Sequence, residues 1–494
     1  MKRIVMLLLL AAVASCNKFL EEEPSGSLNL QHYYKTPEQV KAAVNGTYEG
    51  LGLPFTANLG ISVSPVYSLE YITGYSRRPR PSGFEDDQFL RLDRLDDANS
   101  RLQGWWNATY YPVENCNSVI EHVSATTLVD EATKRRYLGQ AYFLRAWYYF
   151  QAVRLFGDVP LKLTTTKDLN DVRIRRSPKE VVYEQILKDL AAAEDSGLPW
   201  ADPSGRVSLG AVKSLLAKVY ITMAGYPLQK GAPYYQKAYD KAKEVIASGQ
   251  FSLFEQYGDL RNPALQNTRE HIFMLQRHPT VAASNIHGAY LPYPDQPISI
   301  QPAYGGAMAP VQAFYDSYGN GDGRKQERAF FYTRYPRYGN PAETIFFPAP
   351  YIFKFWDDEA EKSGRSGANF PLIRYADVLL LCAEAKSMID GGLTSDATAI
   401  DAYYAVRRRA FPAEAKPVSL ATDAILKERH WELCFEFQAW YDMLRTRKAF
   451  DVERGVMTPL SGYKAPNHLR AFQDSDLQFP LPLAEVQKNP DLAL

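Results

Sequence analysis

The sequence lacks an excess of charge of either sign. Its 494 residues include 56 lysines and arginines and 56 aspartates and glutamates, so the formal net charge at pH 7 is zero. Proteins whose main partner is nucleic acid need a surplus of basic side chains, because binding neutralises phosphates. The basic runs that do occur, such as residues 77–80, have acidic residues nearby, which favours solvated or ion-paired surfaces. The sequence therefore predicts no nucleic-acid partner.

Cysteine is scarce. Apart from Cys16 the chain contains only Cys116, Cys382 and Cys434, each in a segment with a helical pattern and apolar neighbours. Three unmatched cysteines do not make a disulfide framework, and no Cys-x-x-Cys or Cys/His pair has the spacing of a metal site. We therefore expect three buried free thiols, no metal site and no cofactor.

Motifs of common catalytic sites are missing as well. Gly-x-Ser-x-Gly, His-Glu-x-x-His and Walker A patterns are absent. A glycoside hydrolase needs two carboxylates across a cleft, but no motif selects a pair here. A calcium loop at residues 316–321 with Glu327 at its twelfth position would place Tyr318 and Arg324 where oxygen ligands are needed, so a tight turn is favoured. The sequence predicts no catalytic residue and a protein that is not an enzyme.

No apolar run of 18 or more residues occurs, but a shorter one lies at the N-terminus. Two basic residues precede an apolar run of about ten residues at 4–13, which is too short to cross a bilayer and typical of a signal peptide. Two small residues then lead to Cys16, and this ending resembles a bacterial lipobox. The pattern predicts a signal peptide over residues 1–15 and lipid attachment at Cys16. An ordinary signal peptide or a buried N-terminal helix is the alternative.

Helical periodicity dominates the rest of the chain. Apolar residues between 137 and 156 recur at i, i+3 and i+4, and Gly157 and Pro160 follow as a stop signal. Short turns join neighbouring helices, as in tetratricopeptide units, although no strict 34-residue repeat is present. We predict a mainly α fold with a tetratricopeptide-like scaffold of helical pairs at about 33–250 and C-terminal helices at 371–447. The expected helices are 36–51, 103–123, 137–156, 178–195, 208–224, 233–248, 371–391, 396–410 and 422–447.

Two long irregular insertions, 54–102 and 251–370, interrupt the helical pattern. They are rich in Pro, Gly, Tyr and Asn and include short strand-like pieces such as 271–275. Long loops in compact proteins usually carry function. Aromatic residues make 13% of the chain, and tyrosine can form an apolar, hydrogen-bonding platform for a flat ligand. We therefore expect the insertions to form a ligand-binding surface on a helical scaffold.

A set of short blocks runs through the chain in a characteristic order. The clearest are Cys16-Asn17-Lys18-Phe19-Leu20, Phe143-Leu144-Arg145-Ala146, Phe156-Gly157-Asp158-Val159-Pro160, Arg374-Tyr375-Ala376-Asp377, Trp440-Tyr441-Asp442-Met443-Leu444-Arg445 and Phe479-Pro480-Leu481-Pro482. Each block alone is weak, but the ordered set resembles the SusD/RagB family, the surface glycan-binding lipoproteins of Bacteroidetes, over essentially the whole chain. The family often ends in a Gln-Asn-Pro-Gly-Tyr-like tail, which looks truncated here at Leu494.

The resemblance implies an outward-facing lipoprotein of the outer membrane that captures an oligosaccharide and delivers it to a SusC-like TonB-dependent transporter. It divides the chain into the signal peptide, a lipidated tether at 16–32 and a single SusD-like domain at 33–494. Some members of the family bind peptides, so a RagB-type peptide-binding lipoprotein that feeds a peptide importer is the alternative.

In such a family aromatic rings stack on sugar rings and polar side chains bind the hydroxyls. We expect some members of one set of insertion residues to form this platform and the rest to pack in the core. The set consists of Tyr67, Tyr71, Tyr75, Arg77, Trp105, Tyr290, Tyr293, Tyr304 and Trp356.

Charged residues within the family-like blocks have a structural interpretation. Arg145, Arg374, Arg429, Glu432 and Glu436 lie on expected amphipathic helices. Buried charges are rare unless they are paired. We therefore predict that these side chains form ion pairs that fix helix packing.

Overall fold

The structure is a computed structural model that describes residues 33–56, 64–79, 84–168, 173–293, 297–300 and 308–493. The predicted signal peptide, the tether at 16–32 with Cys16, and Tyr304 lie outside the described residues.

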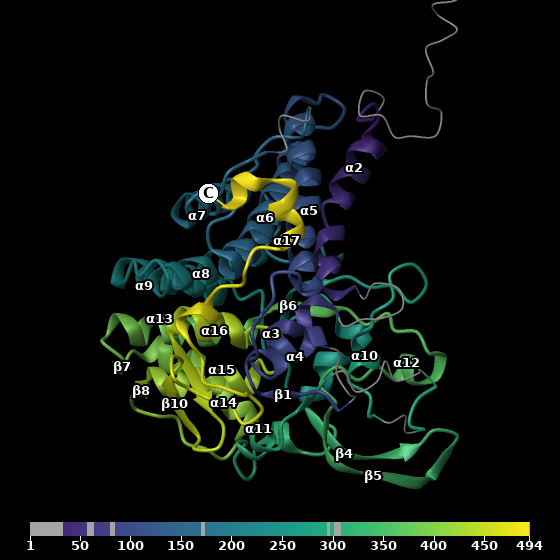
Figure 1. Cartoon of the computed structure of the whole chain (residues 1–494), viewed down its shortest axis with the longest axis vertical. Helices are drawn as coiled ribbons and strands as arrows, with labels where there is room; N and C mark the ends of the chain where they lie inside the picture. The colour runs from purple at the N-terminus through teal and green to yellow at the C-terminus, as the bar shows by residue number, and fades with distance from the viewer. Residues whose placement is uncertain are drawn as a thin grey trace, which may run out of the picture.

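The N-terminal half is a stack of antiparallel helices (Figure 1). α5 packs on α6, α6 on α7, α7 on α8, and α8 on α9. Asn99, Asp130 and Ser208 cap α5, α6 and α8 by accepting hydrogen bonds from N–H groups of the first turn. The predicted helical-pair scaffold is confirmed. Its helices are α2 (Pro37–Gly46), α5 (Ser100–Ala125), α6 (Glu131–Phe156), α7 (Lys179–Glu194), α8 (Leu209–Ala224) and α9 (Ala232–Ala247).

The C-terminal helices extend the same stack. α13 (Tyr375–Ile389) packs against α9, although more than a hundred residues separate them in the chain, and α14 (Ala397–Ala410) packs on α13. The remaining helices are α3 (Ser68–Tyr71), α4 (Phe84–Leu90), α10 (Ile286–Ala289), α11 (Gln312–Asp316), α12 (Asp358–Ser363), α15 (Thr422–Glu432), α16 (Ala439–Thr446) and α17 (Leu483–Lys488).

The prediction of one helix over 422–447 is wrong. The helix breaks between α15 and α16, where Phe435 and Phe437 have φ of 59° and 60°. The carbonyl oxygens of Glu432 and Cys434, freed from helical hydrogen bonds, accept from Nζ of the buried Lys354 at 2.8 and 3.0 Å. A buried lysine thus compensates for the break, a tertiary contact that helical periodicity does not contain.

Short strands occur in both insertions, as predicted. The expected strand at 271–275 is confirmed as β2, and it pairs antiparallel with β6, so residues 371–374 are strand and not the start of a helix. The strands are β1 (Ser76–Arg77), β2 (His271–Leu275), β3 (Ala309–Pro310), β4 (Phe331–Arg337), β5 (Asn340–Ile352), β6 (Phe370–Arg374), β7 (Leu393–Thr394), β8 (Leu420–Ala421), β9 (Lys448–Asp451) and β10 (Val456–Pro459).

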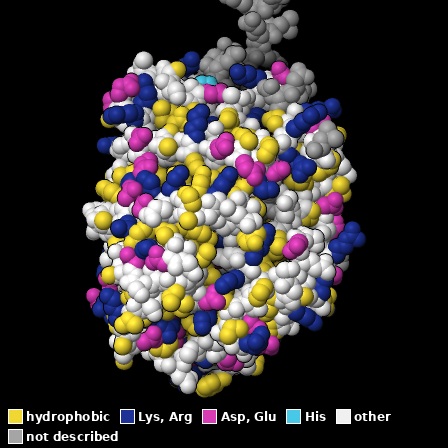
Figure 2. Space-filling view, turned by 90° about the vertical axis from the view of Figure 1, so that its left-hand side faces the viewer, with side chains coloured by type: hydrophobic (Ala, Val, Ile, Leu, Met, Phe, Trp, Pro, Cys, Tyr) yellow, Lys and Arg dark blue, Asp and Glu magenta, His cyan; other side chains and the backbone are white. Residues whose placement is uncertain are grey.

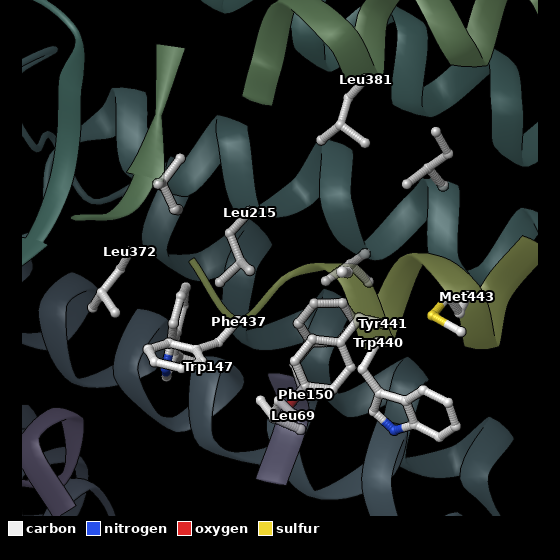
Figure 3. Close-up of a cluster of buried hydrophobic side chains, with 14 of the residues drawn as sticks. Leu69, Trp147, Phe150, Leu215, Leu372, Leu381, Phe437, Trp440, Tyr441 and Met443 are labelled. Atoms are coloured by element: carbon white, nitrogen blue, oxygen red, sulfur yellow. The ribbon is translucent and has the colours of Figure 1, made fainter. Parts of the chain in front are cut away.

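The main hydrophobic core joins the two halves of the chain. Leu69 of α3, Trp147 of α6, Leu215 of α8 and Leu381 of α13 are all buried and converge on the segment around Trp440 (Figure 3). Cys116, Cys382 and Cys434 are buried free thiols within it, as expected. Burial of apolar surface stabilises a fold by roughly 25 cal/mol per Å². Because the insertions and the helices share this core, its burial stabilises their packing against each other.

The charged residues of the family-like blocks form buried ion pairs, as predicted. Burial would raise the pKa of Glu270, but Arg409 and Arg374 outweigh burial and lower that pKa to about 2. The pairs involving the predicted residues are Arg145–Asp189 at 2.7 Å, Arg374–Glu436 at 2.6 Å, Arg429–Asp442 at 2.8 Å and Arg409–Glu432 at 2.7 Å.

On the surface, charges of the two signs are interspersed. The face drawn in Figure 2 shows lysine and arginine side chains mixed with aspartates and glutamates, and neither sign gathers into a large patch. This distribution agrees with the zero net charge. Within the part of the chain that the structure describes, none of the helices combines the length and apolar character required to span a bilayer.

Candidate ligand-binding surface

The two insertions meet at a small antiparallel ladder. β1 of the first insertion pairs with β3 of the second, with Ser76 opposite Pro310 and Arg77 opposite Ala309. The half-buried Arg77 spans the junction, since its Nε donates to the carbonyl of Pro310 at 3.1 Å and its guanidinium lies 5.5 Å from the ring centroid of Tyr351 in β5. The arginine therefore orders this junction as well as carrying charge near the surface.

A long hairpin, β4–β5, extends from this junction at the lower edge of the molecule (Figure 1). Its register sets Arg337 opposite Asn340, which leaves the two-residue turn Tyr338-Gly339. Gly339 has φ of +76°, a left-handed conformation that glycine adopts without steric cost. The amide of Tyr338 donates to the carbonyl of Pro297 at 2.6 Å, so the hairpin turn is tied to the segment before β3.

Exposed rings occur on this hairpin and on the segment that contacts it. Phe346 is 71% exposed, Tyr338 39% and Tyr293 37%. The backbone N–H of Tyr293 donates to the hydroxyl of Tyr351 at 3.4 Å, which places Tyr293 beside β5. We name Tyr293, Tyr338 and Phe346 the hairpin aromatic surface. Exposed aromatic rings leave apolar faces open to contact with a ligand.

A separate aromatic cluster supports this surface from below. Tyr332, Tyr335, Tyr351, Phe353 and Trp356 are all buried there, apart from the main core. Phe353 and Trp356 stack with centroids 5.1 Å apart. Because these side chains fill the space beneath β4–β5, the hairpin is a supported surface and not an isolated ribbon.

Charged and hydrogen-bonding side chains lie on the same hairpin as the rings. Arg334 is exposed on β4, and Arg337 pairs with Glu343 across the hairpin at 2.6 Å. The hydroxyl of Tyr335 donates to Glu361 at 2.8 Å, and burial together with this carboxylate raises the pKa of Tyr335. Within the described ranges, histidine, cysteine, aspartate and glutamate side chains do not gather in groups of three or more that could hold a metal ion.

Most of the aromatic residues predicted to contact ligand are placed in the interior. Their rings pack on protein neighbours and present no free face: Tyr71, for example, is 0% exposed, and Trp356 is 3% exposed within the cluster under the hairpin. The sequence shows that these positions are aromatic, but it does not show that they face the interior. The irregular insertions have no periodicity that would separate buried positions from exposed ones. The buried candidates are Tyr67, Tyr71, Tyr75, Trp105, Tyr290 and Trp356.

Two predicted residues remain at the surface in the described part of the chain. Tyr293 is exposed and Arg77 is half-buried at the junction of the insertions. The sequence interpretation missed Tyr338 and Phe346. A signal for the strand was present, since Ile345-Phe346-Phe347 is an apolar run of β-prone residues and Gly339 precedes it as a turn residue, but three consecutive apolar residues do not show which one faces outward.

Comparisons with known proteins cover most of the chain. Residues 303–493 match the family model described as the SusD family, and residues 82–221 match one described as "Starch-binding associating with outer membrane". A crystal structure of a SusD superfamily protein from Parabacteroides distasonis is 33% identical in sequence and has a TM-score of 0.86, with 92% of this chain and 98% of that chain covered.

Two further relatives extend the comparison. SusD-like protein P2 of Formosa agariphila is 25% identical, over 99% of this chain and 98% of its own length. Surface glycan-binding protein A from Bacteroides fluxus has a TM-score of 0.75 at 21% identity, with 92% of this chain and 97% of that chain covered. At that identity the likeness shows the fold alone.

Proposed function

The chain belongs to the SusD family, and on that premise we propose that it is a binding protein that captures an oligosaccharide through the hairpin aromatic surface. The observation that carries the proposal is the exposure of Tyr338 and Phe346 on a supported hairpin and of Tyr293 on the segment beside it. Pyranose rings have apolar faces of C–H groups, so exposed aromatic rings beside hydrogen-bonding side chains suit them.

The placement of the charged side chains favours binding without catalysis. The charged side chains of the family-like blocks are paired in the interior, as in Arg374 with Glu436. A glycoside hydrolase would need two carboxylates about 5 to 10 Å apart on either side of a bound glycosidic bond. The hairpin aromatic surface instead offers ring faces, which favours capture and release of an intact chain.

The remainder of the proposal concerns where the protein acts. Lipid on Cys16 would hold it at the outer membrane facing outward, and the tether at 16–32 would let it move while it stays near a SusC-like TonB-dependent transporter. One matching family model carries "associating with outer membrane" in its description, which supports this location. The bound oligosaccharide would then pass to the transporter.

An oligosaccharide is favoured over a peptide as the ligand. The exposed rings of the hairpin support this choice, because pyranose rings present apolar C–H faces that stack on aromatic rings. The names of the relatives also refer to starch and glycan.

Screening the purified mature chain against a glycan array and, in parallel, against a pool of short peptides tests this proposal. We expect a set of glycans with a shared linkage to be retained at micromolar to millimolar concentrations, and peptides to remain at background. A chain that retains peptides and no glycan would contradict the proposal, and so would a chain that retains neither.

A further inference from the structure

The outward face of the hairpin carries an arginine next to the most exposed ring of the hairpin. Arg334 of β4 lies directly opposite Phe346 of β5, and the next pair along the register is Tyr335 with Ile345. Residues that are directly opposite in an antiparallel pair point to the same face of the sheet, with Cβ atoms about 4.5–5.5 Å apart. Arg334 and Phe346 are both exposed, whereas Tyr335 is buried and Ile345 is half-buried on the other face. The arginine and the ring therefore share one solvent-facing surface.

The guanidinium of Arg334 is free of protein partners. Among the residues that the structure describes, it makes no salt bridge, donates no hydrogen bond and lies over no aromatic ring. The other two arginines of residues 327–352 are engaged. The guanidinium of Arg328 lies 4.9 Å from the ring centroid of Tyr335, and Arg337 pairs with Glu343 at 2.6 Å. Arg334 is thus the arginine of this segment whose charge and donors stay available to a ligand.

The carboxylates of the same segment are already occupied. Residues 327–352 contain two glutamates and three arginines, with no aspartate or lysine. Glu327 accepts hydrogen bonds from the backbone N–H and the hydroxyl of Thr333, both at 2.9 Å, and from the backbone N–H of Arg334 at 3.2 Å. Glu343 pairs with Arg337. The charge that the hairpin leaves uncompensated is therefore positive, and it lies beside Phe346.

A free guanidinium beside an exposed ring suits one kind of sugar. Its N–H groups can only donate, and their fork matches the paired oxygens of an oxyanion such as a carboxylate. Sugars that carry carboxylate or sulfate groups keep apolar C–H faces, so one unit can stack on Phe346 while its anionic group reaches Arg334. A neutral oligosaccharide would accept hydrogen bonds from this arginine but would leave its charge without a counter-charge.

We propose that the ligand captured at the hairpin aromatic surface is an acidic oligosaccharide, and that Arg334 pairs with one of its carboxylate or sulfate groups. This inference rests on the proposed function and narrows the class of its ligand. The ring of Phe346 supplies contact area that acidic and neutral sugars share, whereas Arg334 responds to the charge of the sugar. Discrimination between acidic and neutral glycans therefore depends on Arg334 and not on the rings.

An array of acidic oligosaccharides and their neutral counterparts tests the class of ligand. Each uronic-acid oligosaccharide is printed beside its carboxyl-reduced form, and each sulfated oligosaccharide beside its desulfated form, so the two members of a pair share a backbone and differ in charge. We expect the purified mature chain to retain acidic members and to retain their neutral partners much more weakly. The pairs that discriminate show whether a carboxylate or a sulfate is the recognised group.

Calorimetric titration with a retained acidic oligosaccharide tests Arg334 itself. We expect Arg334→Gln to weaken binding about fivefold, the effect of losing one exposed charge pair, with an unchanged unfolding midpoint because the side chain is exposed. Arg334→Lys keeps the charge but loses the forked contact, so it should bind with intermediate affinity. Added NaCl should weaken wild-type binding and reduce its advantage over Arg334→Gln, since salt screens exposed charges.

Arg135→Gln is the matched control and should bind the acidic oligosaccharide as the wild-type chain does. Arg135 is also exposed and makes no salt bridge among the described residues, but it lies on α6 in the helical scaffold. Wild-type affinity in Arg334→Gln, or equal losses in the two arginine variants, would overturn the inference. Equal or stronger retention of the neutral members would also overturn it and leave the proposed function standing, whereas an array that retains no glycan would contradict both.

Discussion

Replacing Arg374 with methionine should destabilise the protein by about 3–5 kcal/mol, the cost of removing one partner from a buried charge cluster. Arg374 is 1% exposed and donates to Glu270, to Glu432 at 3.1 Å and to both oxygens of Glu436 at 3.0 Å. Methionine fills much of the same volume but leaves these carboxylates short of a cation. Whole domains are stable by only about 5–15 kcal/mol, so a large part of the margin would be lost. Urea unfolding followed by far-ultraviolet circular dichroism measures the change.

The difference in unfolding free energy between the wild-type chain and Arg374→Met should depend on pH. That dependence separates lost charge pairing from poor packing. In the wild-type chain the lowered pKa of Glu270, about 2, means that its stabilising contribution is present above the carboxyl pKa of the unfolded chain and is lost as pH falls towards 2. In the variant the same carboxyls take up protons at higher pH than in the wild-type chain. The difference in unfolding free energy between the two should therefore become smaller as the pH falls from 7 to 4. A deficit that is equal at both pH values would assign the loss to packing alone.

Arg337→Met is the matched control for that experiment. Arg337 also forms an ion pair, with Glu343 at 2.6 Å, but its side chain is exposed on the hairpin. Solvent screens exposed pairs, so this variant should unfold at the wild-type urea concentration. If Arg337→Met destabilised the chain as much as Arg374→Met, the buried cluster would have no special role.

Replacing Cys16 with alanine should abolish incorporation of fatty acid and release the protein from the outer membrane. Each acyl chain contributes about 0.8 kcal/mol per buried methylene, and two or more chains give stable anchoring. After the N-terminal run the sequence contains no run of 18 or more apolar residues. Labelling growing cells with an alkyne fatty acid, followed by fractionation, gives both readouts.

The other cysteines provide the control for the anchor. Cys116 is buried in the core, so Cys116→Ala should keep the label and the membrane location of the wild-type chain. Label that persists in Cys16→Ala would show that lipid is attached elsewhere. A wild-type chain that carries no label would show that the protein has no lipid anchor.

Helices and charge pairs were predictable because their signals are local or follow from elementary electrostatics. The periodicity at 137–156 identified α6, and the cost of an unpaired buried charge predicted that Arg145 and Arg429 form ion pairs, although not with which residues. The break at Phe435 and Phe437 was not predictable, because it depends on Lys354, some eighty residues away.

The exposure of the candidate ligand-contact residues was predicted less well, and for a physical reason. The sequence shows which positions of the insertions are aromatic, but only the fold decides that Tyr71 faces the core while Tyr293 faces solvent. In a helix the 3.6-residue period separates these faces, whereas the irregular segments have no such period. Burial does alternate along β5 around Phe346, but Ile345, Phe346 and Phe347 are all apolar, so the sequence does not show which of them faces solvent.

Affinity of the hairpin aromatic surface for an oligosaccharide tests the central claim most directly. A glycan that the array retains is titrated into three proteins and the heat of binding is measured. The proteins are the wild-type chain, the double variant Tyr338→Ala/Phe346→Ala, and Tyr111→Ala. Tyr111 is 64% exposed but lies on α5 in the helical scaffold, so it controls for loss of any exposed tyrosine. We predict that the double variant loses at least tenfold in affinity, about 1.4 kcal/mol, with an unchanged unfolding midpoint, and that Tyr111→Ala binds as the wild-type chain does. Wild-type affinity in the double variant would contradict the claim that this surface captures the ligand.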